Sequence, residues 1–139
     1  MNVYLDTSVV LSHFLAQANR LRRWGGWPRA YTSELTRVEF LRIVDRLRLD
    51  GEIDDEARAG LRERFDILWA AVYIVPLSAD ILARAAEPFP TVLGTLDALH
   101  MASALVARDE SGEEAFAVLT HDRQLARAAT ALGVGVDGI

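Results

Sequence analysis

The sequence has no cysteine and no lysine: every residue in its Lys+Arg total of 15 is arginine. The absence of cysteine excludes thiolate catalysis and cysteine-ligated zinc. The absence of lysine excludes a Schiff-base lysine and the lysine of a phosphate-binding P-loop. Long apolar runs are also missing, since none reaches the roughly 18 residues of a membrane span. Catalysis by a cysteine or a lysine side chain, and a membrane-spanning protein, are therefore excluded.

The length of 139 residues suits one domain, which we expect to cover residues 1–139. The N-terminus does not resemble a signal peptide, so we expect a cytoplasmic protein with no membrane partner. The net charge of −5 argues against nucleic-acid binding through overall charge but leaves room for local basic patches. Two arginine clusters are candidates for such patches: Arg20, Arg22, Arg23 and Arg29, and then Arg37, Arg42, Arg46 and Arg48.

Apolar spacing predicts strands that alternate with helices. The segment Ser33–Leu49, for example, reads as a helix because Leu35, Val38 and Val44 recur at near-helical spacing. The expected strands are Asn2–Leu5, Ala30–Thr32, Val72–Val75, Ala115–Leu119 and Val134–Val136. The expected helices are Thr7–Ala16, Ala18–Trp24, Ser33–Leu49, Asp54–Ala70, Ser78–Ala86, Leu96–Ala107 and Asp122–Leu132.

This alternation predicts an α/β fold with a mostly parallel sheet that is covered on both faces. Ligands of such sheets bind beyond the carboxyl ends of the strands. Asp6 and Asp122 each follow a predicted strand and therefore fall at that edge.

Four acids stand out: Asp6, Glu39, Asp97 and Asp122. Three of them have an ordinary explanation, because Asp6 and Asp122 can act as helix N-caps and Asp97 lies in a first helical turn. Glu39 matches a capping box with Thr36, but its helix begins near Ser33, so capping does not explain it.

Close carboxylates repel one another unless a cation holds them, and magnesium or manganese prefers oxygen ligands of this kind. Such a site polarises a phosphoryl oxygen and activates a water for in-line displacement. Ser8 and Thr120 can supply supporting hydrogen bonds.

The segments "YLDTSVVL", "SELTRVEFLR", "LDALHMASAL" and "VLTHDRQLARAATALGV", taken in order, resemble the PIN domain. More narrowly, they are similar to the VapC ribonuclease toxins of toxin–antitoxin pairs. The resemblance implies a three-layer α/β/α sandwich and a metal-dependent endoribonuclease that leaves 5′-phosphate and 3′-hydroxyl ends. It places the acidic site at the four acids named above and matches Ser8 and Thr120 to the family's polar helper positions. The segment "ANRLRRWGGWPRA", residues 18–30, does not align closely.

The resemblance also implies partners: an RNA substrate, a cognate antitoxin protein that lies across a groove beside the acids, and a second copy in a homodimer. The apolar side chains Phe14, Leu15, Trp24 and Trp27 are candidate anchors for that antitoxin. Trp24, Trp27 and Tyr31 can instead stack on bases, although aromatic residues more often pack in a core. His100 shares a helix face with Asp97, and we expect it to pack or hydrogen-bond beside the site, whereas His121 should point elsewhere and His13 carries no signal.

Other functions are open to test. A receiver domain or a haloacid-dehalogenase-type phosphatase also places an Asp after a first strand, but both depend on a lysine that this chain lacks. The phosphatase also expects a second Asp where this chain has Ser8. A non-catalytic binding module on a PIN scaffold should have lost an acid, and all four are present. An RNA-processing nuclease without an antitoxin remains an alternative.

Overall fold

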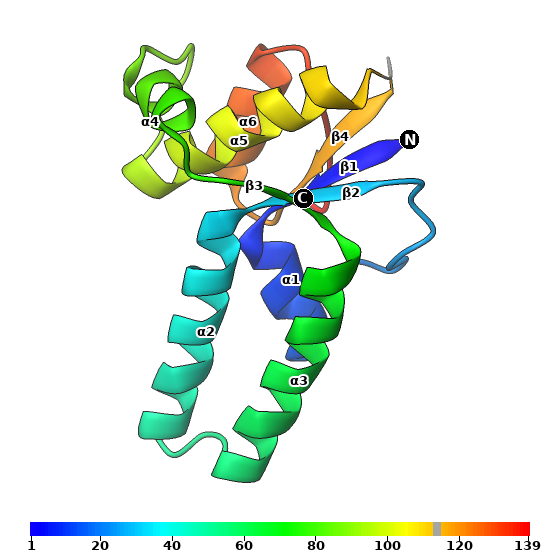
Figure 1. The fold of residues 1–139 in the computed structure, drawn as a ribbon, viewed down its shortest axis with the longest axis vertical. Helices are drawn as coiled ribbons and strands as arrows, with labels where there is room; N and C mark the ends of the chain where they lie inside the picture. The colour runs from blue at the N-terminus through cyan, green and yellow to red at the C-terminus, as the bar shows by residue number, and fades with distance from the viewer. Residues whose placement is uncertain (113–114) are drawn as a thin grey trace.

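The centre of the protein is a sheet in which every pair of neighbouring strands is parallel (Figure 1). The computed structural model describes residues 1–112 and 115–139. Within these residues the strand order is β3-β2-β1-β4-β5. The predicted strands are confirmed to within one residue at each end: β1 (Asn2–Leu5), β2 (Ala30–Ser33), β3 (Tyr73–Val75), β4 (Phe116–Leu119) and β5 (Gly135–Asp137).

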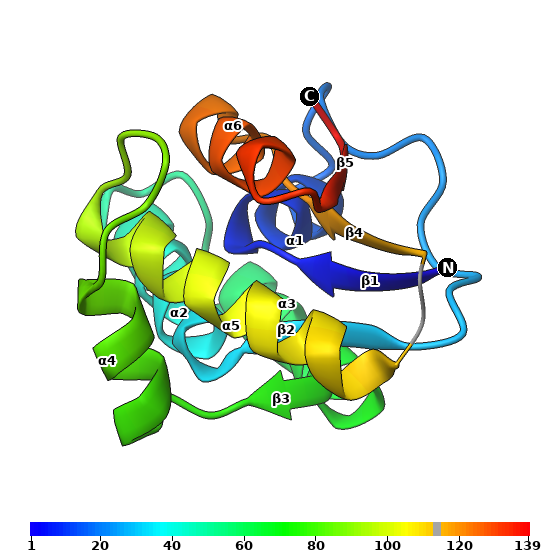
Figure 2. The same ribbon diagram turned by 90° about the horizontal axis from the view of Figure 1, so that it is seen from above.

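Helices cover both faces of the sheet, so the predicted three-layer α/β/α sandwich is confirmed (Figures 1 and 2). Three helices pack on one face, and the other three pack on the opposite face. The first group is α1 (Thr7–Phe14), α2 (Glu34–Leu49) and α3 (Asp55–Ala71), and the second is α4 (Ala79–Ala86), α5 (Thr95–Ser111) and α6 (Arg123–Ala131).

β1 is the middle strand and has no accessible side chain: all four of its residues are buried. Alternate side chains of a strand point to opposite faces. Val3 and Leu5 accordingly join the core beneath α1, α2 and α3, whereas Tyr4 joins the core beneath α5 and α6. A strand buried on both faces explains the unbroken apolar run at the start of the sequence.

α2 and α3 form an antiparallel pair that extends beyond the sheet (Figure 1). Ser33 caps α2 by accepting a hydrogen bond from the amide of Leu35, and Asp54 caps α3 by accepting one from the amide of Ala57. Phe40 of α2 stacks on Phe65 of α3, with ring centroids 4.4 Å apart. Phe40 and Phe65 belong to the core that these two helices share with α1 and the sheet.

The predicted helix Ala18–Trp24 is wrong, because these residues form turns and bends. Ala16 has a positive φ of 51°, which ends the helical path after α1. Leu21, Trp24 and Trp27 pack on the core and hold the loop by side-chain contacts rather than by helical hydrogen bonds. In the part of the chain that the structure describes, no helix is long and apolar enough to span a membrane.

The winding of the chain reverses at β1, because β2 and β3 lie on one side of it and β4 and β5 on the other. In open parallel sheets such a switch point opens a crevice at the carboxyl ends of the strands. Asp6 follows β1 there, and its amide donates a hydrogen bond to the carbonyl of Leu119 at the end of β4 (3.0 Å). The fold thus brings the ends of β1 and β4 together.

Candidate active site

Asp6 occupies the N-cap position of α1, but its side chain makes no capping hydrogen bond. Its Oδ2 instead accepts hydrogen bonds from the hydroxyls of Ser8 (2.6 Å) and Thr120 (2.8 Å). The interpretation of Asp6 as an ordinary cap is therefore wrong. Its carboxylate is buried and is held at the switch point by one hydroxyl from the first turn of α1 and one from the loop after β4.

Asp122 has a structural role beside this arrangement. It caps α6 as predicted, because Oδ1 accepts a hydrogen bond from the amide of Leu125 (2.9 Å). Its own amide donates to the hydroxyl of Thr120 (2.9 Å). Thr120 thus links Asp122 to Asp6 through one fully buried side chain.

Glu39 enters the site from the second turn of α2. Its Oε1 accepts a hydrogen bond from the hydroxyl of Thr7 (2.7 Å) and lies 2.6 Å from Nε2 of His100 on α5. Glu39 is partly buried, and Ser33 rather than Thr36 caps its helix. A capping box is therefore excluded as the reason for this glutamate.

His100 lies between two of the acids. Its Nε2 is 3.5 Å from Oδ1 of Asp6, in addition to the contact with Glu39. Its Nδ1 is 2.7 Å from the hydroxyl of Tyr4 beneath it. His100 is 2% exposed, so both ring nitrogens are committed within the protein. The prediction that His100 packs or hydrogen-bonds beside the acids is confirmed.

The charges at this edge alter one another's protonation. Burial lowers the pKa of His100, but the hydrogen bond to Glu39 and the charges of Asp6, Glu39 and Asp97 outweigh it and raise the pKa above the usual value. For Glu39, burial raises the pKa of the carboxyl group. The hydrogen bonds from His100 and Thr7, together with the positive charge of His100, outweigh burial, so the pKa of Glu39 is lowered.

Asp97, in the first turn of α5, shows that the acids act on one another. Burial, followed by the negative charges of Asp122 and Asp6, raises its pKa from 3.8 to about 6. The positive charge of His100 only partly offsets this. Four carboxylates from four separate segments therefore share one electrostatic environment, and a bound cation would relieve their repulsion.

The site's donor atoms fit a hard divalent cation. Every one of the four acids keeps an oxygen that accepts no hydrogen bond from any described residue: Asp6 Oδ1, Glu39 Oε2, Asp122 Oδ2 and both oxygens of Asp97. Such oxygens are the ligands that magnesium and manganese prefer. As placed, no three acid or histidine side chains among residues 1–112 and 115–139 converge closely enough to hold a metal ion. The assignment of a metal here thus depends on donor chemistry and electrostatics.

Sequence reasoning missed two members of the network, Thr7 and Tyr4. Thr7 follows Asp6 directly and contacts Glu39 and His100, whereas Tyr4 supports His100 from the strand. The only sequence signal was their position in the same run as Asp6. His121 points away from the acids as predicted: its ring contacts the hydroxyl of Ser12 and the carbonyl of Gly138.

The aromatic residues pack rather than lie open for base stacking. Tyr31 is buried in the core, and Trp24 stacks on His13 with ring centroids 3.9 Å apart. Phe14 and Trp24 line a hollow of about 420 Å³ between the end of α1 and α3, together with His13, Arg64, Ile67, Leu68 and Ala71. His13, for which the sequence carried no signal, thus belongs to an aromatic cluster.

A parallel α/β/α sandwich with carboxylates at its switch point defines a recognisable class. The model of the PIN domain matches residues 3–131, and the chain belongs to that family. Ribonuclease VapC47 of Mycobacterium tuberculosis is 30% identical over 130 residues, a match that covers 88% of this chain and 86% of that protein. The family predicted from the sequence segments is confirmed.

Two solved structures share the fold at low sequence identity. A toxin–antitoxin complex from Klebsiella pneumoniae matches with a TM-score of 0.65 and 16% identity, over 99% of this chain and 98% of that chain. FitAcB from Neisseria gonorrhoeae matches with a TM-score of 0.62 and 20% identity, over 96% and 95% of the two chains.

Proposed function

We propose that the protein is an endoribonuclease, the toxin of a VapBC-type toxin–antitoxin pair, and that it hydrolyses RNA phosphodiester bonds with magnesium or manganese. The observation that carries the proposal is the arrangement of Asp6, Glu39, Asp97 and Asp122 at one edge of a PIN-domain sheet, each with a carboxylate oxygen that accepts no hydrogen bond from a described residue. Similarity to ribonuclease VapC47 supports RNA as the substrate.

The four acids would hold the cation between them, and its chemistry would be to polarise the scissile phosphate and to lower the pKa of a water. The chain's own residues fix the acids for this task. Ser8 and Thr120 hold Oδ2 of Asp6, so that Oδ1, which lies 3.5 Å from Nε2 of His100, accepts no hydrogen bond. His100 and Thr7 hold Oε1 of Glu39 and leave Oε2 without a hydrogen bond.

An antitoxin is the proposed protein partner, supported by neighbours whose structures are toxin–antitoxin complexes. The hollow that Phe14 and Trp24 line is a suitable place for an apolar anchor of such a segment. Leu15 and Trp27, the other predicted anchors, pack against the core instead of lining it. An antitoxin arginine could pair with the acids in place of a cation.

A homodimer is also proposed. Leu82 and Leu96 are about half exposed and Val92 is 79% exposed, all on α4, α5 and the loop between them. Leu82 lines a hollow of about 380 Å³ between these helices. Exposed apolar side chains gathered in this way are typical of an interface.

The test uses purified protein, a radiolabelled RNA mixture and growth of an expressing host. Cleavage that requires a divalent cation, growth arrest on expression, and rescue by coexpression of the neighbouring small gene product would support the toxin. A protein that cleaves RNA but binds no small partner and harms no host would instead be a processing nuclease. Absence of cleavage with any divalent cation would remove the ribonuclease function.

A further inference from the structure

The loop between α1 and β2 carries a group of arginines that the proposed catalytic site does not use. Arg20, Arg22 and Arg23 are exposed and line a hollow of about 610 Å³ beside the end of β5. The other lining residues are Ala18, Asn19, Leu21, Asp137, Gly138 and Ile139. Asp137 is the one acidic side chain in that lining, so positive charge dominates the hollow.

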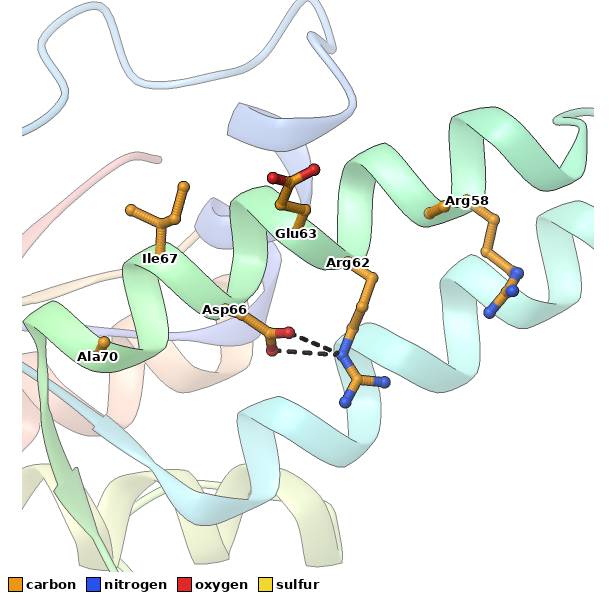
Figure 3. Close-up of a pocket in the computed structure, with 7 residues that line it drawn as sticks. Arg58, Arg62, Glu63, Asp66, Ile67 and Ala70 are labelled. Atoms are coloured by element: carbon orange, nitrogen blue, oxygen red, sulfur yellow. Dashed lines mark hydrogen bonds and ion pairs between the residues drawn. The ribbon is translucent and has the colours of Figure 1, made fainter.

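Five of the other arginines in the described residues form ion pairs with an aspartate close to them in sequence. Arg42, Arg48 and Arg62 each form an ion pair with an Asp on their own helix, as do Arg46 with Asp50 and Arg108 with Asp109. Figure 3 shows this for Arg62, whose guanidinium is turned to Asp66 on α3. Arg22 and Arg23 have no ion pair with any residue in the part of the chain that the structure describes, and Arg20 donates to the backbone carbonyls of Ala16 and Gln17.

The hollow is joined to the acidic site by direct contacts. Gly138 lines the hollow, and its carbonyl contacts the ring of His121. The amide of His121 donates to the hydroxyl of Ser8 (3.0 Å), which in turn donates to Asp6. Leu21, which lies between Arg20 and Arg22 in the sequence, packs against the core and so holds the arginine loop beside the end of β5.

We propose that Arg20, Arg22 and Arg23 bind phosphates of the substrate RNA strand on the β5 side of the acidic site. This inference rests on the proposed ribonuclease function. A site of four carboxylates repels a polyanion, so the strand needs cations nearby to be held. Guanidinium groups without an ion pair match the geometry of phosphate oxygens. The hollow is connected to Asp6 through Gly138, His121 and Ser8, so an RNA strand that extends from the acidic site on this side would run along it.

The loop's chemistry favours RNA over an acidic protein segment. An extended acidic peptide would be expected to find apolar anchor positions between the charges, yet Leu21, the one large apolar side chain within the arginine run, is half-buried against the core. A single strand instead needs a charged track, since its phosphates recur along the backbone.

The experiment compares two double variants in an Asp97→Asn background, so that bound RNA is not cut. R22A/R23A removes the proposed contacts, and R42A/R46A removes the same charge from the exposed face of α2, where both arginines are already paired. Binding of a fluorescein-labelled oligouridine of roughly 20 nucleotides is measured by anisotropy across a salt series. Melting curves confirm that each variant is folded.

We expect R22A/R23A to weaken RNA binding by about tenfold or more and to reduce the salt slope by about 1.4, the value for two lost phosphate contacts on a single strand. R42A/R46A should bind within about threefold of the parent, and so should R22K/R23K, which keeps the charge. Equal binding by R22A/R23A and R42A/R46A would overturn the inference, as would a lysine variant as weak as the alanine one. Binding of a fluorescein-labelled polyglutamate is measured in the same way, and an R22A/R23A variant that loses polyglutamate binding but keeps RNA binding would also overturn the inference.

Cleavage by the unsubstituted chain is measured in parallel, which separates the two failures. If that chain cuts RNA while R22A/R23A binds RNA normally, the proposed role of the arginines is wrong and the ribonuclease function stands. If the unsubstituted chain cuts no RNA under any divalent cation, the ribonuclease function itself fails.

Discussion

Nε2 of His100 lies 2.6 Å from Oε1 of Glu39, and this contact joins α5 to α2 across 61 residues of sequence. Glu39 also accepts the hydroxyl of Thr7, so helices α1, α2 and α5 meet at one carboxylate. A charge-assisted hydrogen bond in a partly buried place is stronger than one in water. The pair therefore links α2 to α5 at the acidic site, while Oε2 of Glu39 accepts no hydrogen bond from a described residue.

The first prediction concerns Asp97→Asn. We expect RNA cleavage to fall by ~100-fold or more, because a charge that would stabilise the proposed cation and transition state is lost. The stability of the metal-free protein should hold or rise by at most ~1 kcal/mol, since the pKa of Asp97 is raised to about 6 and solvent screens a half-exposed group. A cleavage assay and a thermal melt measure both effects.

Glu63→Gln is the matched control, because Glu63 is an exposed residue of α3 that lines a hollow with Arg58 and Asp66 (Figure 3) and takes part in none of the contacts of the acidic site. It should leave cleavage and melting unchanged. Full activity in Asp97→Asn would remove Asp97 from the site.

The second prediction concerns the cation. Magnesium or manganese that binds only the folded protein should raise the melting temperature by mass action, by several degrees at concentrations well above the dissociation constant. The shift should shrink in Asp97→Asn. Calcium should bind but support little cleavage, because it is larger and less strict in geometry. Undiminished cleavage in excess EDTA would contradict the proposed chemistry.

The third prediction is the pH dependence of unfolding in the metal-free protein. The raised pKa of His100 contributes stability that is present below ~6.5 and is lost as the pH rises through the folded-state pKa. The lowered pKa of Glu39 contributes stability that is present above ~4.3 and is lost as the pH falls through its folded-state pKa. Asp97, with a raised pKa of about 6, favours its protonated form and so destabilises the fold as the pH rises from ~3.9 through 6.

The three effects together place the maximum of stability between about pH 5 and 6, with a decline toward pH 8. Urea unfolding at a series of pH values measures the curve. Glu39→Gln removes the charge that supports His100, and the curve should flatten on both sides. A Glu39→Gln profile that coincides with that of the parent chain would show that the pair is not coupled in solution.

The fourth prediction tests the close approach at Gly138. A Cβ added there would lie 2.7 Å from the carbonyl oxygen of Thr120, and the φ of +101° already disfavours any side chain. Gly138→Ala should cost ~1–3 kcal/mol of unfolding free energy and should disturb the hydroxyl that holds Asp6. Denaturant unfolding and cleavage rates measure these two effects.

Gly133→Ala is the control, since Gly133 also has a positive φ (+73°) but open space around it. It isolates the backbone strain from the clash and should cost ~1 kcal/mol without changing cleavage. An equal cost in the two variants would mean that the contact with Thr120 does not constrain the site.

The strands and most of the helices were predictable because their signals are local. β1 reads as a buried strand from its own four residues, and Asp54 and Ser78 mark helix starts through their own caps. The failures have tertiary causes. Residues 18–24 have helical composition, but packing of Leu21 and Trp24 on the core determines their path. Val38 fits the apolar period of α2 yet is 56% exposed, whereas Phe40 and Val44 of the same helix are buried, so Val38 lies on the side of α2 that faces solvent.

The sequence by itself determined the order of strands and helices along the chain and the family, and it predicted four acids as a site, three of them near places where strands end or helices begin. These properties follow from periodicity, caps and short segments, which need only neighbouring residues. Only the tertiary structure decided that Asp6 is held by hydroxyls rather than acting as a cap, that His100 joins Glu39 to Tyr4, and that the arginines of the 18–23 loop lie beside the site. Each of these depends on side chains from segments far apart in the chain, and the packing of the parallel sheet alone brings them within hydrogen-bonding distance.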